Sequence, residues 1–241
     1  MCAQCALSPS SSCSCPVPAA FSSAQTVAAG SQHMVVRTPD GSVWTWGTNA
    51  HGQLGDASTQ TRKVPTEVSS ISGVTAVAAG ANHTLALKSD GTVWAWGANS
   101  QGQLGDGTQT NRNAPVQVGG LSAVLAIAAG GDLSVALTSS GAVWTWGRNS
   151  NGQLGDGSTT LSKNATVVSA APAASAIAAG DSHTLLIKTD GSVWGWGANG
   201  NGQLGDASTT QRTSPAQMSG VTGAVAVAGG GSHSLVLLSD G

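Results

Sequence analysis

The apolar residues of this chain fall into short runs separated by Gly, Asp, Ser and Asn. In the second copy of the pattern these runs cover residues 74–79, 83–88 and 93–97, and a polar loop leads to a fourth run at 115–118. Apolar runs of this length, bounded by turn-forming residues, are typical of strands. Pro115 begins the fourth run, which suits an edge strand because proline lacks a backbone N–H. No stretch keeps a capped 3.6-residue apolar period, so we expect strands and no helix.

An Asp-Gly pair separates the second and third runs. It stands at Asp90-Gly91 in the second copy and recurs as Asp40-Gly41, Asp190-Gly191 and, in a weaker form, Ser140-Gly141. Asp-Gly between apolar runs predicts a hairpin with a type I′ turn, in which both central residues take positive φ. The runs are therefore expected to pair as an antiparallel meander.

The pattern repeats every 50 residues without insertion or deletion. A column of glycines keeps this step, at Gly30, Gly80, Gly130, Gly180 and Gly230. The motif Gly-Gln-Leu-Gly-Asp keeps it too, ending at Asp56, Asp106, Asp156 and Asp206. Four short antiparallel strands repeated around an axis form the blades of a β-propeller. We expect an all-β partial propeller, with four complete blades at about 24–68, 74–118, 124–168 and 174–218 and half a blade at 224–241.

The third run of each unit places two tryptophans on one face of a strand. In the second unit Val93 and Ala95 point one way, and Trp94 and Trp96 point the other. Both faces are apolar, as expected for a blade that a neighbour covers on each side. All 8 tryptophans of the chain belong to this motif, so we interpret them as scaffold and expect Trp94 to be a core residue.

The composition excludes several classes of protein. Charged residues make up 8% of the chain, and Lys plus Arg number 9 with a net charge of −2. This balance excludes the basic surface of a nucleic-acid-binding protein. No apolar run approaches the roughly 18 residues of a membrane span. The lysine-poor composition, rich in Ser, Thr, Asn and Gly, favours a bacterial protein that is secreted or located on the cell surface.

Residues 1–23 form an irregular leader, rich in Ser, Pro and Cys, that does not follow the repeat. The leader holds the 4 cysteines, which are Cys2, Cys5, Cys13 and Cys15. Zinc ligation is one interpretation, but no histidine or second well-spaced Cys-x-x-Cys pair supports it, and we favour a low-complexity segment with free or paired thiols. Pro16-Val17 is interpreted as the last strand of a degraded preceding repeat.

Four histidines occupy the same place in the repeat, which raises the question of a metal site. They are His33, His83, His183 and His233, and Leu133 takes this place in the third unit. Equivalent atoms of neighbouring blades lie about 10 Å apart, whereas zinc needs nitrogens at about 2.0–2.1 Å. We therefore expect no metal or other cofactor, and we predict buried histidines hydrogen-bonded to the backbone.

The same argument from the spacing of the blades applies to the aspartates that end the Gly-Gln-Leu-Gly-Asp motif, which are too far apart to share a metal ion. Each follows a glycine and precedes a Ser/Thr-rich loop, so we interpret them as turn-capping residues. Arg62, Arg112 and Arg212 follow at a constant spacing and are expected to pair with them, whereas Ser162 replaces the arginine in the third unit. No Ser-His-Asp or Cys-His constellation stands out, and carboxylates that recur once per repeat at the same position cannot form a close acid–base pair across blades. The chain is not expected to be an enzyme.

The repeated unit also resembles a known family through four motifs. They cover residues 80–87 and 90–91, the strand 93–97 and the segment 102–106. Together they resemble the regulator of chromosome condensation repeat over about residues 24–241. The resemblance implies a seven-bladed propeller, which would need about 350 residues at this period. We therefore expect a partial ring, a fragment of a longer protein, with uncovered blade faces prone to self-association.

We interpret the chain as a non-enzymatic propeller scaffold that binds a protein partner, whose identity the sequence does not specify. The resemblance also implies an alternative, a guanine nucleotide exchange factor for a small GTPase. The nuclear member of the family uses an inserted wedge and a basic tail, and the constant period leaves no room for a wedge in this chain. A structural or carbohydrate-binding repeat of a cell-surface protein is the third alternative.

The candidate partner-binding residues are those at which the repeats differ, because variation between repeats marks positions that the fold leaves free. One set follows the glycine column on one rim and comprises Gln32, Asn82, Asp132 and Asp181. A second set lies in the long polar loops and comprises His51, Gln101, Arg148 and Asn201.

Overall fold

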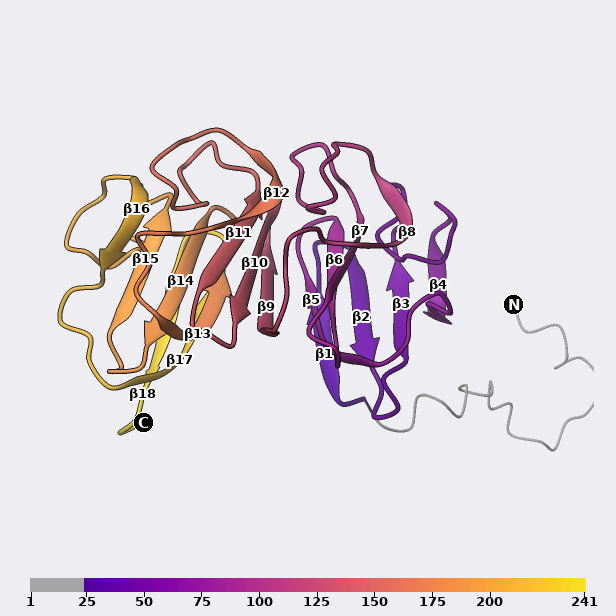
Figure 1. Cartoon of the computed structure of the whole chain (residues 1–241), viewed down its shortest axis with the longest axis horizontal. Helices are drawn as coiled ribbons and strands as arrows, with labels where there is room; N and C mark the ends of the chain where they lie inside the picture. Colours follow the sequence, from indigo (N-terminus) through magenta and orange to yellow (C-terminus); the bar gives the residue numbers. More distant parts are fainter. Residues whose placement is uncertain (1–23) are drawn as a thin grey trace, which may run out of the picture.

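The structure, a computed structural model, describes residues 24–241 as strands joined by turns, with no helix in that range. The leader, with its cysteines and Pro16-Val17, lies outside the described residues. Each sheet is a meander in which sequential strands pair antiparallel (Figure 1). The predicted all-β class and the antiparallel blades are confirmed.

Four blades of four strands and one pair of strands follow one another along the chain. The first blade has β1 (Thr26–Ala29), β2 (His33–Arg37), β3 (Val43–Gly47) and β4 (Arg62–Glu67). The second has β5 (Val74–Ala79), β6 (His83–Lys88), β7 (Val93–Gly97) and β8 (Arg112–Gln117). The third has β9 (Val124–Gly130), β10 (Leu133–Thr138), β11 (Val143–Gly147) and β12 (Ser162–Val167). The fourth has β13 (Ala174–Ala179), β14 (His183–Lys188), β15 (Val193–Gly197) and β16 (Arg212–Gln217), and the half blade has β17 (Ala224–Gly229) and β18 (Ser234–Leu238).

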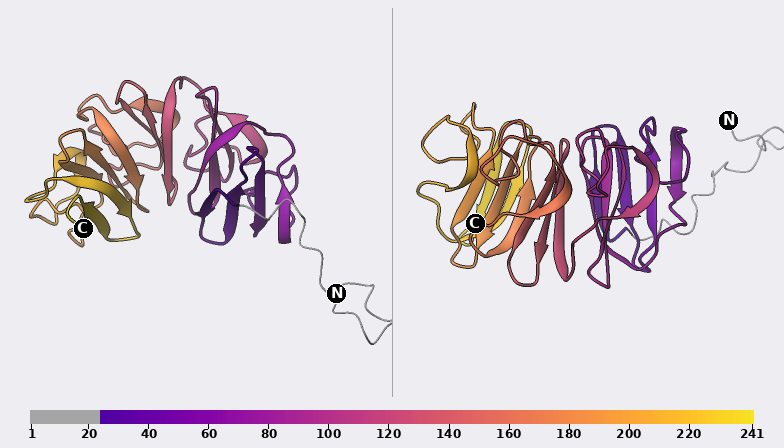
Figure 2. Two further views of the ribbon diagram at one scale, coloured as in Figure 1. Left: turned by 90° about the horizontal axis from the view of Figure 1, so that it is seen from below. Right: turned by 45° about the horizontal axis from the view of Figure 1, so that its top comes forward.

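The sheets follow an open arc, with the first strand of each blade on its inner side (Figure 2). These inner strands are rich in Ala and Gly because neighbouring blades converge along the axis. At the glycine column the backbones meet directly, since a Cβ on Gly30 would lie 2.5 Å from the carbonyl oxygen of Gly80. A Cβ on Gly180 would lie 2.6 Å from the oxygen of Gly230. Close approach, and not a positive φ, therefore requires glycine at these positions.

The hydrophobic core lies between the blades. Trp96 of the second blade is fully buried and packs in one cluster with Val35 and Val43 of the first blade. Its indole Nε1 donates a hydrogen bond to the carbonyl oxygen of Gln53, 3.0 Å away. Trp94, by contrast, is half-buried, with the Lys88 ammonium 5.7 Å from its ring centroid. The prediction for Trp94 is therefore corrected, because the fully buried tryptophans, Trp96, Trp146 and Trp196, are each the second of their pair.

The hairpin between the second and third strands is present, but its predicted type I′ turn is wrong. Gly91 has a φ of 77°, whereas Asp90 is not in the positive-φ region. The amide of Gly91 donates to the oxygen of Lys88, and the amide of Lys88 donates to Thr92, as in a longer loop closed by a glycine bulge. The carboxylate of Asp90 accepts hydrogen bonds from the amide and hydroxyl of Thr92. This capping favours the ordinary right-handed conformation at the aspartate.

The fourth strand starts earlier than the apolar run predicted. In the second blade β8 begins at Arg112, which lies opposite Gly97 in the ladder. The register then shifts between Ala95 and Gly97, and Pro115 falls within this irregular stretch. β8 is the outermost strand of its sheet, so the predicted edge position is confirmed. Proline is tolerated there because an edge strand at a bulge does not need every backbone N–H.

The half blade exposes apolar side chains that are buried elsewhere in the repeat. Leu235 and Leu237 on β18 are 64% and 53% exposed. Their equivalents in the second blade, Leu85 and Leu87, are 0% and 4% exposed. The difference arises because, within residues 24–241, no further blade packs on this face.

Trp96→Ala should lower the free energy of unfolding by about 3–5 kcal/mol, because it removes a fully buried ring between two blades. Trp94→Ala should cost clearly less, since that ring is half-buried. Urea denaturation followed by circular dichroism measures both losses. Equal losses for the two variants would contradict this description of the core.

Gly130→Ala should destabilise the fold by about 1–3 kcal/mol or more, because the new Cβ would overlap the carbonyl group of Gly180 and force two inner strands apart. Gly200→Ala is the matched control, since its Cβ would meet no atom within 4 Å. The urea midpoints of the two variants should therefore diverge. A tolerated alanine at residue 130 would refute the backbone contact.

Candidate functional site

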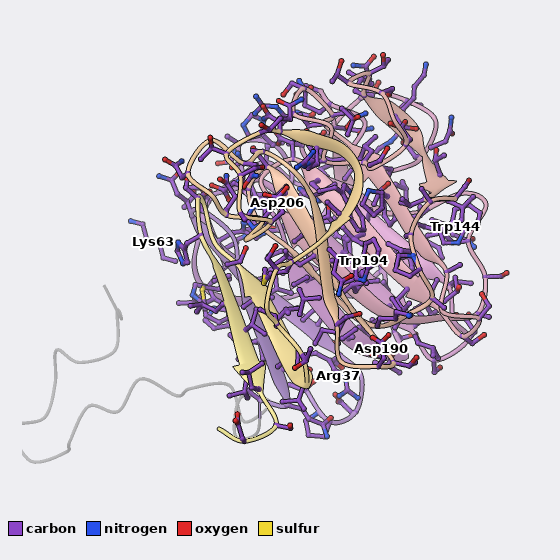
Figure 3. All side chains as sticks on the ribbon, turned by 90° about the vertical axis from the view of Figure 1, so that its left-hand side faces the viewer. Arg37, Lys63, Trp144, Asp190, Trp194 and Asp206 are labelled. Carbon is purple, nitrogen blue, oxygen red and sulfur yellow. The ribbon has the colours of Figure 1, made fainter. Side chains whose placement is uncertain are left out.

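The two sets of candidate residues lie on one face of the arc. In an antiparallel meander, the turn between the first and second strands and the loop between the third and fourth strands emerge at the same end. We call this end the loop face. It comprises the inner turns 30–32, 80–82, 130–132 and 180–182 and the long loops 48–61, 98–111, 148–161 and 198–211. Figure 3 shows Asp206 toward the loop face and Asp190, in a hairpin turn, toward the opposite end.

The first residue of each long loop is hydrogen-bonded to the inner turn of its own blade. The amide of Thr48 donates to the oxygen of Gln32 at 2.9 Å, and that of Arg148 donates to the oxygen of Asp132 at 2.9 Å. The amide of Ala98 makes the equivalent bond to Asn82 at 2.8 Å. The rim and the loop set that the sequence suggested are therefore parts of one continuous surface.

The candidate residues are spread around the loop face and do not form a single pocket. Five side chains are exposed, namely Gln32, His51, Arg148, Asp181 and Asn201. Three are half-buried, namely Asn82, Gln101 and Asp132. Of these residues, Asp181 lines a cavity of about 290 Å³ that the inner turns form around the axis. The exposed side chains form a broad surface that can contact a large partner.

Asp132 is the centre of the charged part of the loop face. Its carboxylate accepts a hydrogen bond of 2.9 Å from the side chain of Gln103 in the preceding blade. Burial raises the pKa of Asp132, the charges of Arg148 and His51 lower it, Asp181 raises it, and the net change is upward. The chain therefore keeps a carboxylate here whose ionisation the fold disfavours.

Gln103 was missed by the sequence analysis because it belongs to a motif shared by all repeats. Its side chain reaches Asp132, while its carbonyl oxygen accepts bonds from Ser134 and Trp146 of the next blade at 2.8 and 2.9 Å. Gln53 and Gln153 hold the same carbonyl position in their junctions. The glutamine of the motif thus connects the core to the loop face.

Three of the four repeated histidines, His33, His83 and His183, are buried as predicted, whereas His233 in the half blade is exposed. The partner of each buried ring is a side chain and not the backbone. His33 Nε2 lies 3.0 Å from the Thr84 hydroxyl in the next blade, and His83 Nε2 lies 3.0 Å from the Ser134 hydroxyl. Burial lowers the pKa of His33 to about 4 and that of His83 to about 3. Among residues 24–241, no group of three or more His, Cys, Asp and Glu side chains could hold a metal ion.

The predicted turn-capping aspartates hold the long loops in shape. Asp106 accepts hydrogen bonds from the Thr108 amide and hydroxyl and from Asn99, and Arg112 pairs with it at 2.8 Å. Asp56 and Asp206 form the same pairs with their arginines at 2.6 and 2.7 Å. Burial alone would raise the pKa of Asp106, but the bonds from Thr108 and Arg112 outweigh it and the pKa is lowered. The predicted pairing is confirmed.

The chain belongs to the RCC1-like domain family, which its sequence matches over residues 2–241. A stretch of 46 residues is 41% identical to the RCC1 domain-containing protein RUG3, mitochondrial, of Arabidopsis thaliana, and covers 19% of this chain and 10% of that protein. A stretch of 47 residues is 47% identical to the E3 ubiquitin-protein ligase HERC2 of Homo sapiens, and covers 20% of this chain and 1% of that protein.

Solved structures show the same fold. Prp20p from Saccharomyces cerevisiae is similar with a TM-score of 0.75 and 23% identity, over 88% of this chain and 55% of that one. Yeast RCC1 (Prp20) in its complex with Kap60 is similar with a TM-score of 0.77 and 22% identity, over 89% of this chain and 54% of that one. The chain thus spans about half the length of these propellers. In the part of the chain that is described, no helix is long and apolar enough to cross a membrane.

Asp132→Asn should stabilise the protein at pH 7, because the raised pKa means that ionisation of this carboxyl opposes folding. The gain should vanish as the pH falls through the pKa of Asp132, where the wild-type group is also neutral. Asp106→Asn is the control and should destabilise the protein at pH 7, since the lowered pKa of Asp106 means that its ionisation favours folding. Urea midpoints measured between pH 3 and pH 7 test both signs, and a loss of stability in Asp132→Asn at pH 7 would contradict the assignment.

Proposed function

We propose that this chain is a non-enzymatic scaffold whose loop face binds a protein partner. The observation that carries the proposal is the convergence of both sets of variable residues on that face. The opposite end presents nearly the same Asp-Gly turn in three of the four complete blades. A surface whose side chains differ from blade to blade offers a distinct pattern of contacts, which is what selective recognition needs.

The framework beneath the loop face supports this role. Each long loop is held by the hydrogen bonds of its capping aspartate, such as those of Asp106 with Asn99 and Arg112, and by the backbone hydrogen bond to the inner turn. The side chains of the loops can therefore differ while the backbone stays the same. The carboxylate of Asp132 is kept although its ionisation opposes folding, and such costs are common at functional positions. A rigid, pre-organised surface loses little entropy when it binds.

The relatives favour a protein as the ligand. The structure of Prp20p is described together with its binding properties to Gsp1p and histones, and Prp20 has been solved in a complex with Kap60. We include in the proposal a secreted or cell-surface location, on the basis of the lysine-poor composition.

Family membership also favours a second candidate, a guanine nucleotide exchange factor for a small GTPase. The third candidate, carbohydrate binding, has less support. Ligand sites of that kind are typically lined by aromatic side chains, and among residues 24–241 every tryptophan lies in a third strand and none is exposed.

Partner capture with matched charge reversals tests the proposal. Arg148→Glu changes the loop face, and Lys63→Glu makes the same change at an exposed position of the outer strand β4. A protein recovered from extracts of the source organism should bind wild type and Lys63→Glu alike, and Arg148→Glu about tenfold or more weakly. Calorimetry with the purified partner measures the three affinities.

Two results would contradict the scaffold proposal. One is a partner whose affinity is unaffected by Arg148→Glu, or that is weakened equally by Lys63→Glu. The other is acceleration of nucleotide release from a purified small GTPase at micromolar protein, which would establish the exchange factor in its place.

A further inference from the structure

Three of the four blade junctions within residues 24–241 contain a buried histidine. We call His33, His83 and His183 the junction histidines. Each places its Nε2 on a hydroxyl of the next blade, at 3.0 Å from Thr84, 3.0 Å from Ser134 and 2.9 Å from Ser234. The remaining junction, between the third and fourth blades, has Leu133 at this position, opposite Thr184.

The hydrogen bonds determine which nitrogen carries the proton. The Thr84 hydroxyl has one hydrogen, and it donates that hydrogen to the oxygen of Gln53 at 2.9 Å. The hydroxyl must therefore accept from His33, which makes Nε2 the protonated nitrogen. The hydroxyls of Ser134 and Ser234 likewise donate to carbonyl oxygens, those of Gln103 at 2.8 Å and Gln203 at 2.7 Å. All three junction histidines thus share one neutral tautomer.

The second ring nitrogen of each junction histidine has no partner. Nδ1 of His33, His83 and His183 is buried without a hydrogen bond. A bare lone pair is tolerated, but a second proton would create a buried N–H without an acceptor and a buried positive charge. Each ring lies close to the column glycine of its own blade, since a Cβ on Gly30 would lie 2.2 Å from Cε1 and 2.4 Å from Nδ1 of His33.

The surrounding charges differ between the junctions. Among the described residues, burial lowers the pKa of His33, and burial together with the charge of His33 lowers the pKa of His83, with no carboxylate among these causes. His183 faces Asp181, which favours its protonation, and His233, which opposes it. Protonation therefore costs most at the two junctions that join the first three blades.

We propose that the junction histidines make the propeller acid-sensitive, so that protonation separates blades at the His33 and His83 junctions while the Leu133 junction stays closed. This acid sensitivity goes beyond the proposed binding function and does not depend on it. Because His33 and His83 directly follow the inner turns of the loop face, their junctions and that face are expected to loosen together.

The sign and size of the effect follow from proton linkage. Unfolded histidine titrates near pH 6.5, whereas burial lowers the folded pKa to about 4 for His33 and about 3 for His83. The unfolded state then binds more protons below pH 6.5, so stability falls as the pH falls toward the folded pKa. Between pH 7.5 and pH 5 each of these histidines should raise the unfolding equilibrium constant by about 30-fold.

Replacing the junction histidines by leucine, the residue at this position in the third blade, provides the test. Between pH 7.5 and pH 5, the double variant with His33→Leu and His83→Leu should lose much less stability in urea than wild type does, and His183 should account for the loss that remains. His51→Gln is the control, because this histidine is exposed and does not contribute to the pKa shifts of the junction histidines, and the variant should retain the wild-type pH dependence. Leu133→His should introduce a further acid-sensitive junction. Unchanged pH dependence in the double variant would overturn the proposal.

NMR of the wild-type chain decides the question even if the double variant fails to fold. The imidazole nitrogen shifts of His33 and His83 should show the neutral Nε2–H tautomer at pH 7, with no protonation down to pH 5. A ring that protonates near pH 6.5 in the folded protein, or that carries its proton on Nδ1, would overturn the proposal. Hydrogen exchange at pH 5 should be faster in β6 and β10 than in β14.

Discussion

The direct contact between neighbouring backbones at the glycine column is the constraint on which this structure depends. Where Gly30 meets the carbonyl of Gly80, there is no room for any side chain. This approach brings the inner strands together, and the outer strands then diverge enough to admit a tryptophan such as Trp96 between blades. Each unit therefore keeps a glycine at this position, and these glycines recur at the 50-residue step of the repeat.

A single motif glutamine links the packing of the junctions to the loop face. The carbonyl of Gln103 receives bonds from the buried Trp146 and Ser134, while its side chain binds Asp132 on the loop face. Core and surface are therefore coupled through one residue. A change that loosens a junction, such as protonation of His83 beside Ser134, is expected to reach the loop face through this connection.

Two kinds of residue in this repeat oppose stability, and both occupy positions at which the blades carry chemically different side chains. Asp132 keeps a carboxylate whose ionisation the fold disfavours, and His83 keeps a neutral ring with a buried nitrogen that has no partner. The third blade shows that leucine fits this position, because Leu133 is fully buried there. Retention of the histidine elsewhere is consistent with a role in response to pH.

Local features of the chain were readable from the sequence, whereas contacts between blades were not. The bounds of β5, β6 and β7 and the capping aspartates follow from side-chain alternation and turn chemistry, which involve residues close in the chain. The turn type was mispredicted although it is local, because Thr92 caps the carboxylate of Asp90. The greater burial of Trp96 than Trp94, the Thr84 partner of His33 and the union of the two loop sets were decided by the tertiary structure. Each of the last three depends on how blades or strands pack side by side. A sequence repeat shows that such partners exist but not which atoms they bring together, because that depends on the angle and separation at which the sheets stack.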